Sequence, residues 1–490
     1  MSSPSKTTIK PGKLFIGGEW CEAKSGKTFS TINPATAEPI IDIADADIAD
    51  VDLAVSAARS SLNTGAWAKM SGSERGEILW RVGDLIMKYA DELAELETID
   101  VGKPIIESRR IDVPFSADCF RYFAGAASKL QGETIPVRSN CFTYTLREPL
   151  GVVALIVPWN FPLLLATRKV APALAAGNTV ILKPAPNSPL TAIRLAEICQ
   201  EAGIPAGVFN VLTGSTRELG QALVDHSGVD GVSFTGSTAV GQEIVRRSAT
   251  TLKHVEVELG GKSPNVVFAD ADLEAAVRGT ISAIFYNCGE VCTAGSRLLV
   301  EESVHERFVE QLVARTKKLT PGDPLDPKTR LGPIVSQEQM NRVLSYIETG
   351  KAEGAKLLVG GNRANVGNGK GYYVEPTVFD QVDNKMKIAR EEIFGPVLST
   401  ITFRDLDEAI AKSNDTIYGL AAAVWTRDVK KAHRLARAIK AGTVWINTYN
   451  MFDCASPYGG YKMSGFGREQ GLEAFNFYTQ TKSVWIDLNE

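Results

Sequence analysis

GVVALIV (151–157) opens the most regular part of the chain. Helical segments at 163–176, 189–202, 216–226 and 239–249 separate it from four further apolar runs: NTVILK (178–183), VFNVLTG (208–214), VDGVSFTG (229–236) and HVEVELGG (254–261). Continuous apolar strands that alternate with helices are typical of a parallel sheet covered on both faces. The pattern predicts an α/β fold with a doubly wound parallel sheet, an architecture suited to nucleotides.

The flanking segments extend this pattern. Helical periodicity marks 48–66 and 74–98, and a second alternating α/β stretch fills roughly 262–460. Residues 131–149 are strand-like, and TKSVWIDL (481–488) predicts a final exposed strand. Because an exposed edge strand needs a partner, we expect pairing between subunits.

The composition is that of an ordinary globular chain. Of 490 residues, 44% are apolar and 22% are charged, and the net charge of −4 gives no electrostatic reason to bind nucleic acid or an anionic membrane. No window reaches the roughly 18 apolar residues that span a bilayer, and the N-terminus lacks the apolar core of a secretory signal. We expect a cytoplasmic protein of two to four domains, disordered only in its polar start MSSPSK.

Seven cysteines are spread thinly over the chain: Cys21, Cys119, Cys141, Cys199, Cys288, Cys292 and Cys454. Their odd number argues against a disulfide framework. Cys288 and Cys292 are four residues apart and could share one helix face, but a metal site needs further ligands, and none of the four histidines is close to them in sequence. We therefore expect no metal site.

Cys292 is the candidate nucleophile. In FYNCGEVCTAGSR (285–297), Gly289 and Gly295 bracket it with small residues that leave its side chain approachable. A thiolate is a strong nucleophile toward a carbonyl carbon. The alternative, a buried and inert thiol, is the better interpretation of the neighbouring Cys288.

Two further motifs offer a base and an oxyanion donor. In VEVELGGKSP (255–264), Glu258 falls at the end of an apolar strand, where burial would raise its pKa and suit it to general base catalysis. In VPWNFP (157–162), two prolines stiffen the turn that holds Asn160, whose NH2 could donate to an oxyanion. Taken singly, an ordinary strand-end carboxylate and a turn-forming asparagine are the simpler interpretations.

A fourth motif, FTGSTAVG (234–241), follows a strand and opens a helix. Gly236 and Ser237 would then lie beside a pyrophosphate at a helix N-terminus. The usual G-x-G-x-x-G fingerprint is absent from the expected place, so this motif indicates little by itself.

In combination, these motifs resemble the NAD(P)-dependent aldehyde dehydrogenase superfamily. The resemblance extends from about residue 12 to residue 488, and the 34-residue separation of Glu258 and Cys292 fits that family. The matching motifs are PWNFP (158–162), KPA (183–185), FTGSTAVG, ELGGKSP, GEVCTAGSR, EEIFGPV (391–397) and PYGGYKMSGFGRE (457–469).

The resemblance implies a mechanism. The cysteine corresponding to Cys292 attacks the aldehyde, the amide corresponding to Asn160 and the cysteine's own N–H hold the oxyanion, and hydride leaves for the nicotinamide. The glutamate matching Glu258 then activates the water that hydrolyses the thioester. Lys169 and Glu469 match a lysine and a glutamate thought to relay protons behind that base, although both fit a structural ion pair equally well.

The resemblance also implies a site for NAD or NADP. Its contacts map to Trp159, Lys183, Pro186, Gly236, Ser237, Glu392 and Phe394. Lys183 would bind the adenosine ribose, Glu392 the nicotinamide ribose, and Phe394 would pack near the ring or simply fill core. Many NAD-preferring members have a glutamate where this chain has Pro186. Because such a glutamate repels a 2′-phosphate, its absence predicts that NADP is accepted.

The substrate positions of the family map to Phe115, Phe161, Leu164, Leu165, Arg168, Tyr286, Thr293, Asn450, Phe452 and Tyr458. Most are aromatic or aliphatic, which favours a broad range of aldehydes, apolar or aromatic in preference. Arg168 resembles the carboxylate-binding arginine of succinate semialdehyde dehydrogenases, but Tyr286 stands where those enzymes have a second arginine. A semialdehyde dehydrogenase stays open as an alternative, and so does an Arg168 turned away in an ion pair.

Two other classes of function are weighed against this one. A coenzyme A-dependent acylating enzyme typically lacks the base glutamate, and a non-catalytic binding protein on the same fold typically loses its catalytic residues. The chain retains Cys292, Glu258 and Asn160.

The resemblance further implies three parts and a homodimer or homotetramer. The expected parts are a cofactor-binding domain (1–130 and 150–261), a catalytic domain (262–460) and an oligomerisation element (131–149 and 475–490).

Overall fold

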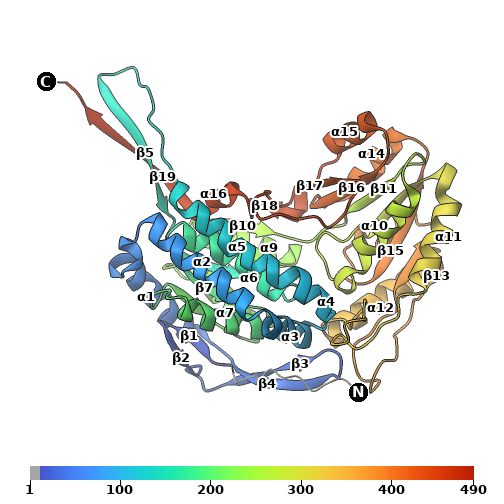
Figure 1. Cartoon of the computed structure of the whole chain (residues 1–490), viewed down its shortest axis with the longest axis horizontal. Coiled ribbons are helices and arrows are strands. Elements are labelled where there is room, and N and C mark those ends of the chain that lie inside the picture. The colour runs from blue at the N-terminus through green and yellow to red at the C-terminus, as the bar shows by residue number, and fades with distance from the viewer. Residues whose placement is uncertain (1–11, 490) are drawn as a thin grey trace.

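Two large β-sheets, each flanked by helices, and a projecting two-stranded arm are the main parts of the molecule (Figure 1). The computed structural model describes residues 12–489. The start MSSPSK, for which we expected disorder, falls outside the described residues. Among residues 12–489, no helix has the length and apolar character that a membrane span requires.

The first sheet contains eight strands in the order β18-β10-β9-β6-β7-β8-β1-β2. Their bounds are β1 (Leu14–Ile16), β2 (Glu19–Cys21), β6 (Val152–Ile156), β7 (Thr179–Lys183), β8 (Phe209–Val211), β9 (Gly231–Thr235), β10 (His254–Glu258) and β18 (Gly465–Phe466). The five strands from β6 to β10 run parallel, which confirms the doubly wound sheet. The strand order reverses at β6, between β7 and β9, so ligands are expected at the carboxyl ends of these strands.

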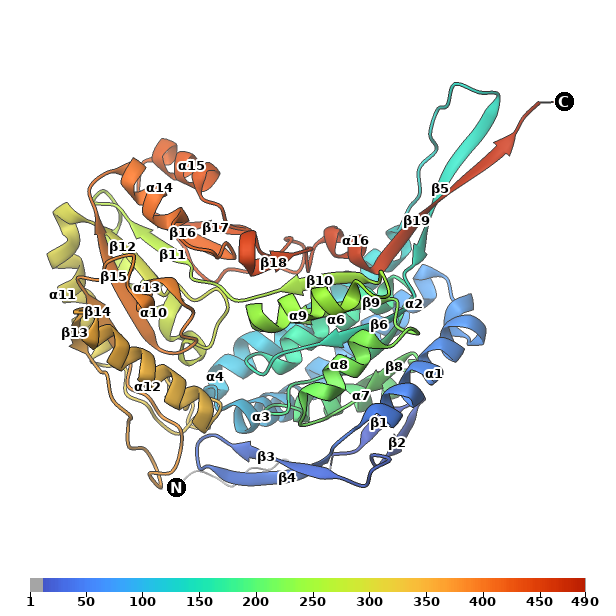
Figure 2. The same ribbon diagram turned by 180° about the vertical axis from the view of Figure 1, so that it is seen from behind.

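Helices cover both faces of this sheet (Figure 2). They are α1 (Ile48–Thr64), α2 (Gly72–Lys88), α3 (Ala90–Val101), α5 (Val113–Ala126), α6 (Pro162–Ala175), α7 (Leu190–Glu201), α8 (Arg217–Asp225) and α9 (Thr238–Ser248). Alternate residues of a strand point to opposite faces. Val153 and Leu155 therefore pack with α6 and α7, whereas Val152 and Ala154 pack with α1 and α8.

The helical periodicity predicted over 74–98 is confirmed, but the stretch is divided between two helices. Two helices, α2 and α3, meet at Tyr89, whose φ of −102° and ψ of 22° leave the helical region. The Tyr89 hydroxyl donates to Glu201 at 2.9 Å, and the guanidinium of Arg194 lies over its ring. Contacts with α7 stabilise the break at Tyr89. The apolar periodicity of the sequence continues through Tyr89, so the sequence alone does not reveal the break.

The second sheet contains seven strands in the order β13-β14-β15-β12-β11-β16-β17, all from residues 262–460. Their bounds are β11 (Pro264–Val267), β12 (Arg297–Glu301), β13 (Lys356–Val359), β14 (Thr377–Asp380), β15 (Val397–Phe403), β16 (Ala421–Trp425) and β17 (Thr443–Ile446). Only β13 is antiparallel to its neighbour. The main helices around it are α10 (Leu273–Phe285), α11 (His305–Thr316), α12 (Gln337–Ala352), α14 (Leu406–Asn414) and α15 (Val429–Ala438).

The arm pairs two segments that are far apart in the sequence. In it, β5 (Cys141–Pro149) runs antiparallel to β19 (Thr479–Asp487), and the pair projects away from both sheets (Figure 1). Trp485 and Phe142 on the arm are 58% and 44% exposed. Within residues 12–489 the outer edge of β19 has no further strand partner. A separate hairpin, β3 (Thr28–Asn33) and β4 (Glu38–Ala44), was not expected from the sequence.

Candidate active site

Cys292 lies in a tight loop between η4 (Tyr286–Gly289) and β12. Asn287 and Cys288 adopt left-handed backbone conformations, with φ values of 44° and 57°, which persist only where the surroundings hold them. The backbone N–H of Asn287 donates to Glu107 at 3.0 Å. Cys288 is buried in η4 and Cys292 is partly exposed beyond it, so the two thiols do not share a helix face as their spacing had suggested.

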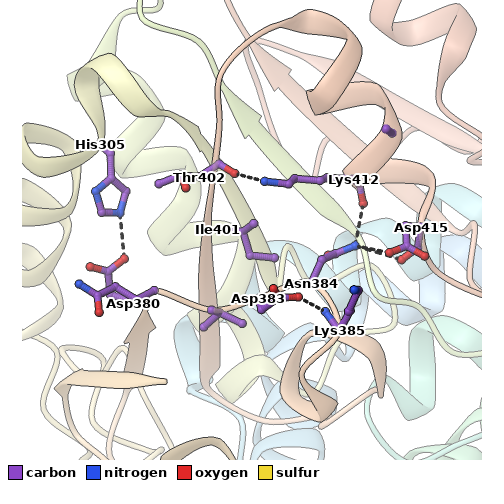
Figure 3. Close-up of a pocket in the computed structure, with 12 residues that line it drawn as sticks. His305, Asp380, Asp383, Asn384, Lys385, Ile401, Thr402, Lys412 and Asp415 are labelled. Carbon is purple, nitrogen blue, oxygen red and sulfur yellow. Dashed lines mark hydrogen bonds and ion pairs between the residues drawn. The ribbon is translucent and has the colours of Figure 1, made fainter. Parts of the chain in front are cut away.

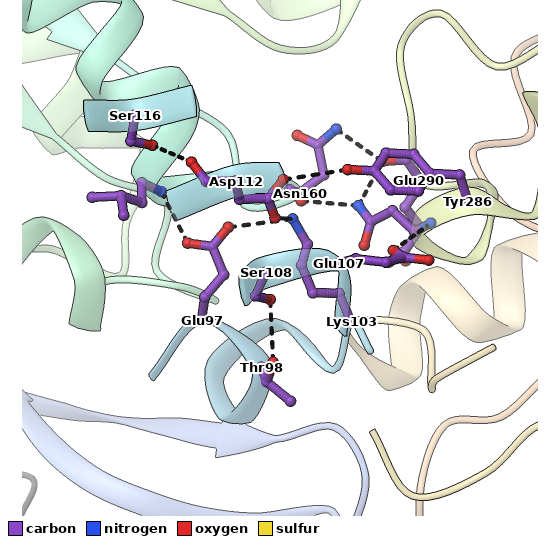
Figure 4. A network of polar contacts seen from close by, with 12 residues as sticks. Glu97, Thr98, Lys103, Glu107, Ser108, Asp112, Ser116, Asn160, Tyr286 and Glu290 are labelled. Atoms are coloured by element: carbon purple, nitrogen blue, oxygen red, sulfur yellow. Dashed lines mark hydrogen bonds and ion pairs between the residues drawn. The ribbon is translucent and has the colours of Figure 1, made fainter. Parts of the chain in front are cut away.

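Asn160 is fixed against this loop by two reciprocal hydrogen bonds (Figure 4). Its Nδ2 donates to the backbone oxygen of Glu290 at 2.9 Å, and Nδ2 of Asn287 donates to the backbone oxygen of Asn160 at 2.9 Å. The first bond uses one of the two amide N–H groups, which leaves the other for a ligand oxygen. The side chain is 2% exposed, so its orientation is set by the protein.

Tyr458 joins the candidate nucleophile to the candidate base. Its hydroxyl lies 3.2 Å from Cys292 Sγ and donates to Glu258 Oε1 at 3.5 Å. Burial raises the pKa of the Cys292 thiol well above its usual value and Glu258 raises it further, whereas Tyr458 and Arg168 lower it. The thiolate therefore depends on these two neighbours.

Glu258 ends β10 and is 2% exposed. Burial raises its pKa to about 7, the charge of Glu469 acts in the same direction, and Arg168 and Lys169 oppose the shift. A carboxyl group with this pKa changes protonation near neutral pH, which is what a general base requires.

Behind Glu258, two consecutive residues of α6 bind one carboxylate. The guanidinium of Arg168 lies 3.1 Å from Glu469 Oε2, and Lys169 Nζ lies 2.5 Å from Glu469 Oε1. Burial opposes the charge of Glu469, but Lys169 and Arg168 hold its pKa below the usual value. Arg168 is 6% exposed and its guanidinium also lies over the Tyr458 ring at 4.2 Å. The ion pair that the sequence left open is thus formed.

The predicted cofactor residues lie around the carboxyl ends of β6, β7 and β9. Ser237 caps α9 and Gly236 donates its N–H to the Glu258 carbonyl at 3.1 Å. Lys183 ends β7, and burial lowers its pKa to about 8. Pro186 lies in the turn that follows, partly exposed.

Glu392, Trp159 and Phe394 complete this set. Glu392 accepts from the Gly261 N–H at 2.8 Å, burial raises its pKa to about 7, and a Cβ at Gly260 would collide with it. Trp159 and Phe394 pack edge to face at 5.3 Å. A helix N-terminus for phosphate, with a buried amine and a partly exposed carboxylate for ribose hydroxyls, fits a dinucleotide.

Several of the predicted substrate residues pack in aromatic pairs, and one of them, Tyr458, contacts Cys292. Phe161 stacks on Tyr286 at 5.8 Å, and Phe452 packs edge to face on Tyr458 at 5.8 Å. Leu164 and Leu165 are buried in α6, Phe115 is half-buried in α5, and Thr293 follows the nucleophile. Asn450 has a φ of 56° and donates to Ser282 O at 3.2 Å, so its side chain is engaged with α10.

A buried charge cluster packs against Phe161, one of the predicted substrate residues (Figure 4). The sequence analysis did not predict this cluster. Lys103 Nζ contacts Asp112 at 2.5 Å and Glu97 at 3.2 Å, and it lies 3.9 Å from the Phe161 ring centroid. Burial raises the pKa of Glu97 to about 8. No motif indicated this cluster, because its members are scattered along α3 and the turn before α5.

Three further residues were missed or given a smaller part. Tyr458 was predicted only as a pocket wall, yet it contacts both catalytic candidates. Lys262 is buried, and burial with the neighbouring Arg297 lowers its pKa to about 7. Glu256, two residues before Glu258, is also buried. The last two lie inside a quoted motif, so their position was a usable signal.

A surface pocket of about 600 Å³ lies elsewhere, on the second sheet (Figure 3). His305 contacts Asp380 at 2.8 Å there, and Lys412 donates to the Thr402 carbonyl at 2.6 Å. None of the predicted site residues lines it. In the part of the chain that the structure describes, no three His, Cys, Asp or Glu side chains gather as metal ligands would.

Comparisons with known proteins agree over nearly the whole chain. The model of the aldehyde dehydrogenase family matches residues 20–484. Human mitochondrial aldehyde dehydrogenase is 47% identical over 476 residues, 97% of this chain and 92% of the human protein. The crystal structure of the aldehyde dehydrogenase KauB from Pseudomonas aeruginosa superposes with a TM-score of 0.96 at 50% identity, covering 98% of this chain and 97% of that one. The P. syringae indole-3-acetaldehyde dehydrogenase AldA, in complex with NAD+ and IAA, has a TM-score of 0.96 at 49% identity, covering 99% and 98%.

Proposed function

The chain belongs to the aldehyde dehydrogenase family, and from that premise we propose that it oxidises apolar or aromatic aldehydes to carboxylic acids through a thioester on Cys292. The observation that carries the proposal is the contact of one hydroxyl, that of Tyr458, with both the Cys292 sulfur and the Glu258 carboxylate. Nucleophile and base are therefore within reach of one bound carbonyl carbon.

Cys292 attacks the aldehyde carbon as the thiolate. The second N–H of Asn160 stabilises the oxyanion that forms, because its orientation is fixed before the substrate arrives. NAD, when bound, supplies the acceptor for the hydride. Trp159, Lys183, Gly236, Ser237, Glu392 and Phe394 would hold it.

Glu258 then removes a proton from the water that attacks the thioester, and the acid is released. A pKa of about 7 lets the group accept that proton near neutral pH. The base argues for hydrolysis rather than acyl transfer to coenzyme A, and the intact site argues against a non-catalytic binding protein.

The cofactor is NAD, as in the NAD+ complex of the P. syringae relative. We also propose that NADP is accepted. Pro186 has no charge to repel a 2′-phosphate, and its turn follows directly on Lys183.

The aromatic wall favours apolar and aromatic aldehydes. Phe161 stacks on Tyr286, and Phe452 packs against Tyr458, which contacts Cys292. A 49% identical relative is an indole-3-acetaldehyde dehydrogenase. Because Arg168 is paired with Glu469, the semialdehyde alternative has lost its clearest support.

We further propose the three-part division predicted from the sequence and assembly through the arm. The first sheet draws its parallel strands from 150–261, and the second draws all its strands from 262–460. Among residues 12–489, the outer edge of β19 in the arm has no strand partner and Trp485 is exposed, which suits pairing with a second copy in a homodimer or homotetramer.

The test is NAD(P)H formation with hexanal, benzaldehyde and succinate semialdehyde, run with NAD and with NADP. Cys292→Ala should abolish turnover, while Cys21→Ala, a thiol on β2 of the first sheet, should not. No turnover by the wild type with any aldehyde, or full activity of Cys292→Ala, would overturn the proposal.

A further inference from the structure

Cys119 and Cys454 are two thiols in direct contact that the proposed chemistry does not use. Their sulfur atoms lie 3.2 Å apart, although 335 positions separate the two residues in the sequence. Both thiols are free and buried, with exposed fractions of 0% for Cys119 and 6% for Cys454. The odd number of cysteines argues against a disulfide framework, but it does not exclude a single pair that becomes oxidised.

Helix α5 holds the Cys119 side of this contact. Phe115 lies one turn earlier on the same face of α5, and its backbone oxygen is 4.0 Å from the Cys454 sulfur. Burial raises the pKa of the Cys119 thiol well above its usual value, the contact with Cys454 adds to the shift, and Arg168 opposes it. Cys119 is therefore protonated at neutral pH.

Cys454 belongs to a turn between β17 and β18. Its carbonyl accepts a hydrogen bond from the Gly471 N–H at 2.8 Å, whereas Met451 and Phe452, just before it, are 66% and 39% exposed. Cys119, in contrast, is fully buried in a packed helix. A closer approach of the two sulfurs is therefore accommodated by the turn, because surface loops move more readily than packed helices.

The same turn carries residues of the candidate active site. Phe452, two residues before Cys454, packs edge to face on Tyr458, four residues after Cys454. The Tyr458 hydroxyl contacts both Cys292 Sγ and Glu258 Oε1. A displacement of Cys454 thus reaches the group that contacts both nucleophile and base.

We propose that Cys119 and Cys454 form a reversible disulfide when a hydroperoxide oxidises the protein, and that this bond lowers turnover by displacing the turn of Cys454. A disulfide bond is about 2.05 Å long, so the two sulfurs have to approach each other by about 1.2 Å. The effect on turnover rests on the proposed function, whereas the formation of the bond does not.

Oxidation takes two steps, with hydrogen peroxide as the oxidant. The sulfur of Cys454, the less buried thiol, attacks one peroxide oxygen, the O–O bond breaks, and the products are the sulfenic acid of Cys454 and one water. The Cys119 sulfur then attacks the Cys454 sulfur, the S–O bond breaks, and the leaving hydroxide takes the Cys119 thiol proton to form a second water. The two thiols lose two electrons and one peroxide gains them. A dithiol reductant reverses the reaction by thiol–disulfide exchange.

The bond itself is tested in Cys292→Ala, because the catalytic thiol is then absent and no turnover is needed. After treatment with hydrogen peroxide, mass spectrometry should find two peptides joined through Cys119 and Cys454, and dithiothreitol should separate them. Since the bond closes a loop over 335 positions, the unreduced chain should also migrate faster in a denaturing gel. Recovery of both residues as free thiols, or oxidation of Cys454 to the sulfinic acid without a cross-link, would overturn the inference.

Single variants in the same background test the order of the two steps. In Cys119→Ser the resolving thiol is absent, so dimedone should trap the sulfenic acid on Cys454. In Cys454→Ser dimedone should leave Cys119 unlabelled, because Cys119 is fully buried. Cys199→Ser removes another buried thiol, on α7, and is the matched control in which the cross-link should form as before. Labelling of Cys119 with none on Cys454 would overturn the assignment of Cys454 as the thiol that meets the oxidant.

The effect on turnover is measured by comparing oxidised wild type with oxidised Cys454→Ser. Activity with hexanal and NAD is divided by the fraction of Cys292 that iodoacetamide alkylates after unfolding, which removes direct oxidation of Cys292 from the comparison. A displacement of about 1 Å beside a catalytic group should lower this ratio about tenfold or more in the wild type and leave it unchanged in Cys454→Ser. An unchanged ratio in fully cross-linked wild type would overturn the effect on turnover. A wild type that forms no NADH before oxidation would instead overturn the proposed function.

Discussion

The Tyr458 hydroxyl lies 3.2 Å from Cys292 Sγ and 3.5 Å from Glu258 Oε1, so one group contacts both side chains. It is 2% exposed, and both Cys292 and Glu258 raise its own pKa beyond the effect of burial. Tyr458 is therefore protonated at neutral pH and can donate a hydrogen bond. When Cys292 is ionised, the single hydroxyl proton of Tyr458 is donated to the sulfur in place of Glu258, and it stabilises the thiolate without neutralising it.

Removing this hydroxyl should weaken the nucleophile. Tyr458→Phe should raise the pKa of the Cys292 thiol further, because the hydrogen bond that lowers it is lost. We expect kcat/KM to fall about tenfold at neutral pH, the value of one charge-assisted hydrogen bond. Alkylation of Cys292 by iodoacetamide as a function of pH measures the shift directly. Tyr461→Phe, on the exposed part of the same motif, should change nothing, and an unmoved alkylation profile in Tyr458→Phe would contradict the assignment.

Hydrolysis should depend on the protonation of Glu258. The base is active as the carboxylate, and its pKa is raised to about 7. The rate of thioester hydrolysis should therefore be constant above that pH and fall about tenfold per unit below it. Glu258→Gln should retain one burst of NADH per site and lose steady-state turnover by 10² or more, as expected of a lost general base (on the order of 10²–10⁴). Steady-state turnover by Glu258→Gln at the wild-type rate would exclude this role.

Arg168 should not select carboxylate substrates. Its guanidinium is committed to Glu469 at 3.1 Å and to the Tyr458 ring. Arg168→Leu should lower activity on all aldehydes, since it breaks a buried ion pair, but the ratio of kcat/KM for succinate semialdehyde to that for hexanal should change by less than about threefold. A selective loss of succinate semialdehyde activity of tenfold or more would restore the semialdehyde alternative.

Cofactor choice should respond to charge at position 186. Pro186→Glu should lower kcat/KM for NADP by about tenfold or more and leave NAD equal or better, because the new carboxylate repels a 2′-phosphate and accepts from a 2′-hydroxyl. Asn187→Glu places the same charge one residue further along the turn as a control. A wild-type enzyme that already prefers NAD tenfold would contradict the prediction of NADP use.

The parallel sheet and its ligand edge were predictable because their signals are local. Each apolar run is short and flanked by turn residues, so the strands that present Glu258 and Lys183 could be placed to within a few residues. The loop of Asn160 follows directly from one of these runs. Cys292, in the loop before β12 of the second sheet, was predicted from the family motif that contains it.

Contacts between distant residues were not predictable. The break at Tyr89 depends on Glu201, and the pairing of Arg168 with Glu469 joins residues that lie on α6 and beyond β18. Glu256 has the alternation of an exposed strand position, and only packing against Ser233 and Lys169 makes it a buried group. Apolar periodicity predicts which side of a helix or strand is buried, but not which residues it contacts there.

Helix α6 has no side that faces solvent, and all its residues from Pro162 to Ala175 are buried. Arg168 and Lys169 are consecutive and so about 100° apart around the helix axis, yet both reach the same carboxylate. Every position of this helix is consequently constrained by packing, whichever side of the helix it lies on. In a library of all single substitutions it should form an unbroken band of intolerance, and adaptation to new aldehydes will have to come from the loops around it.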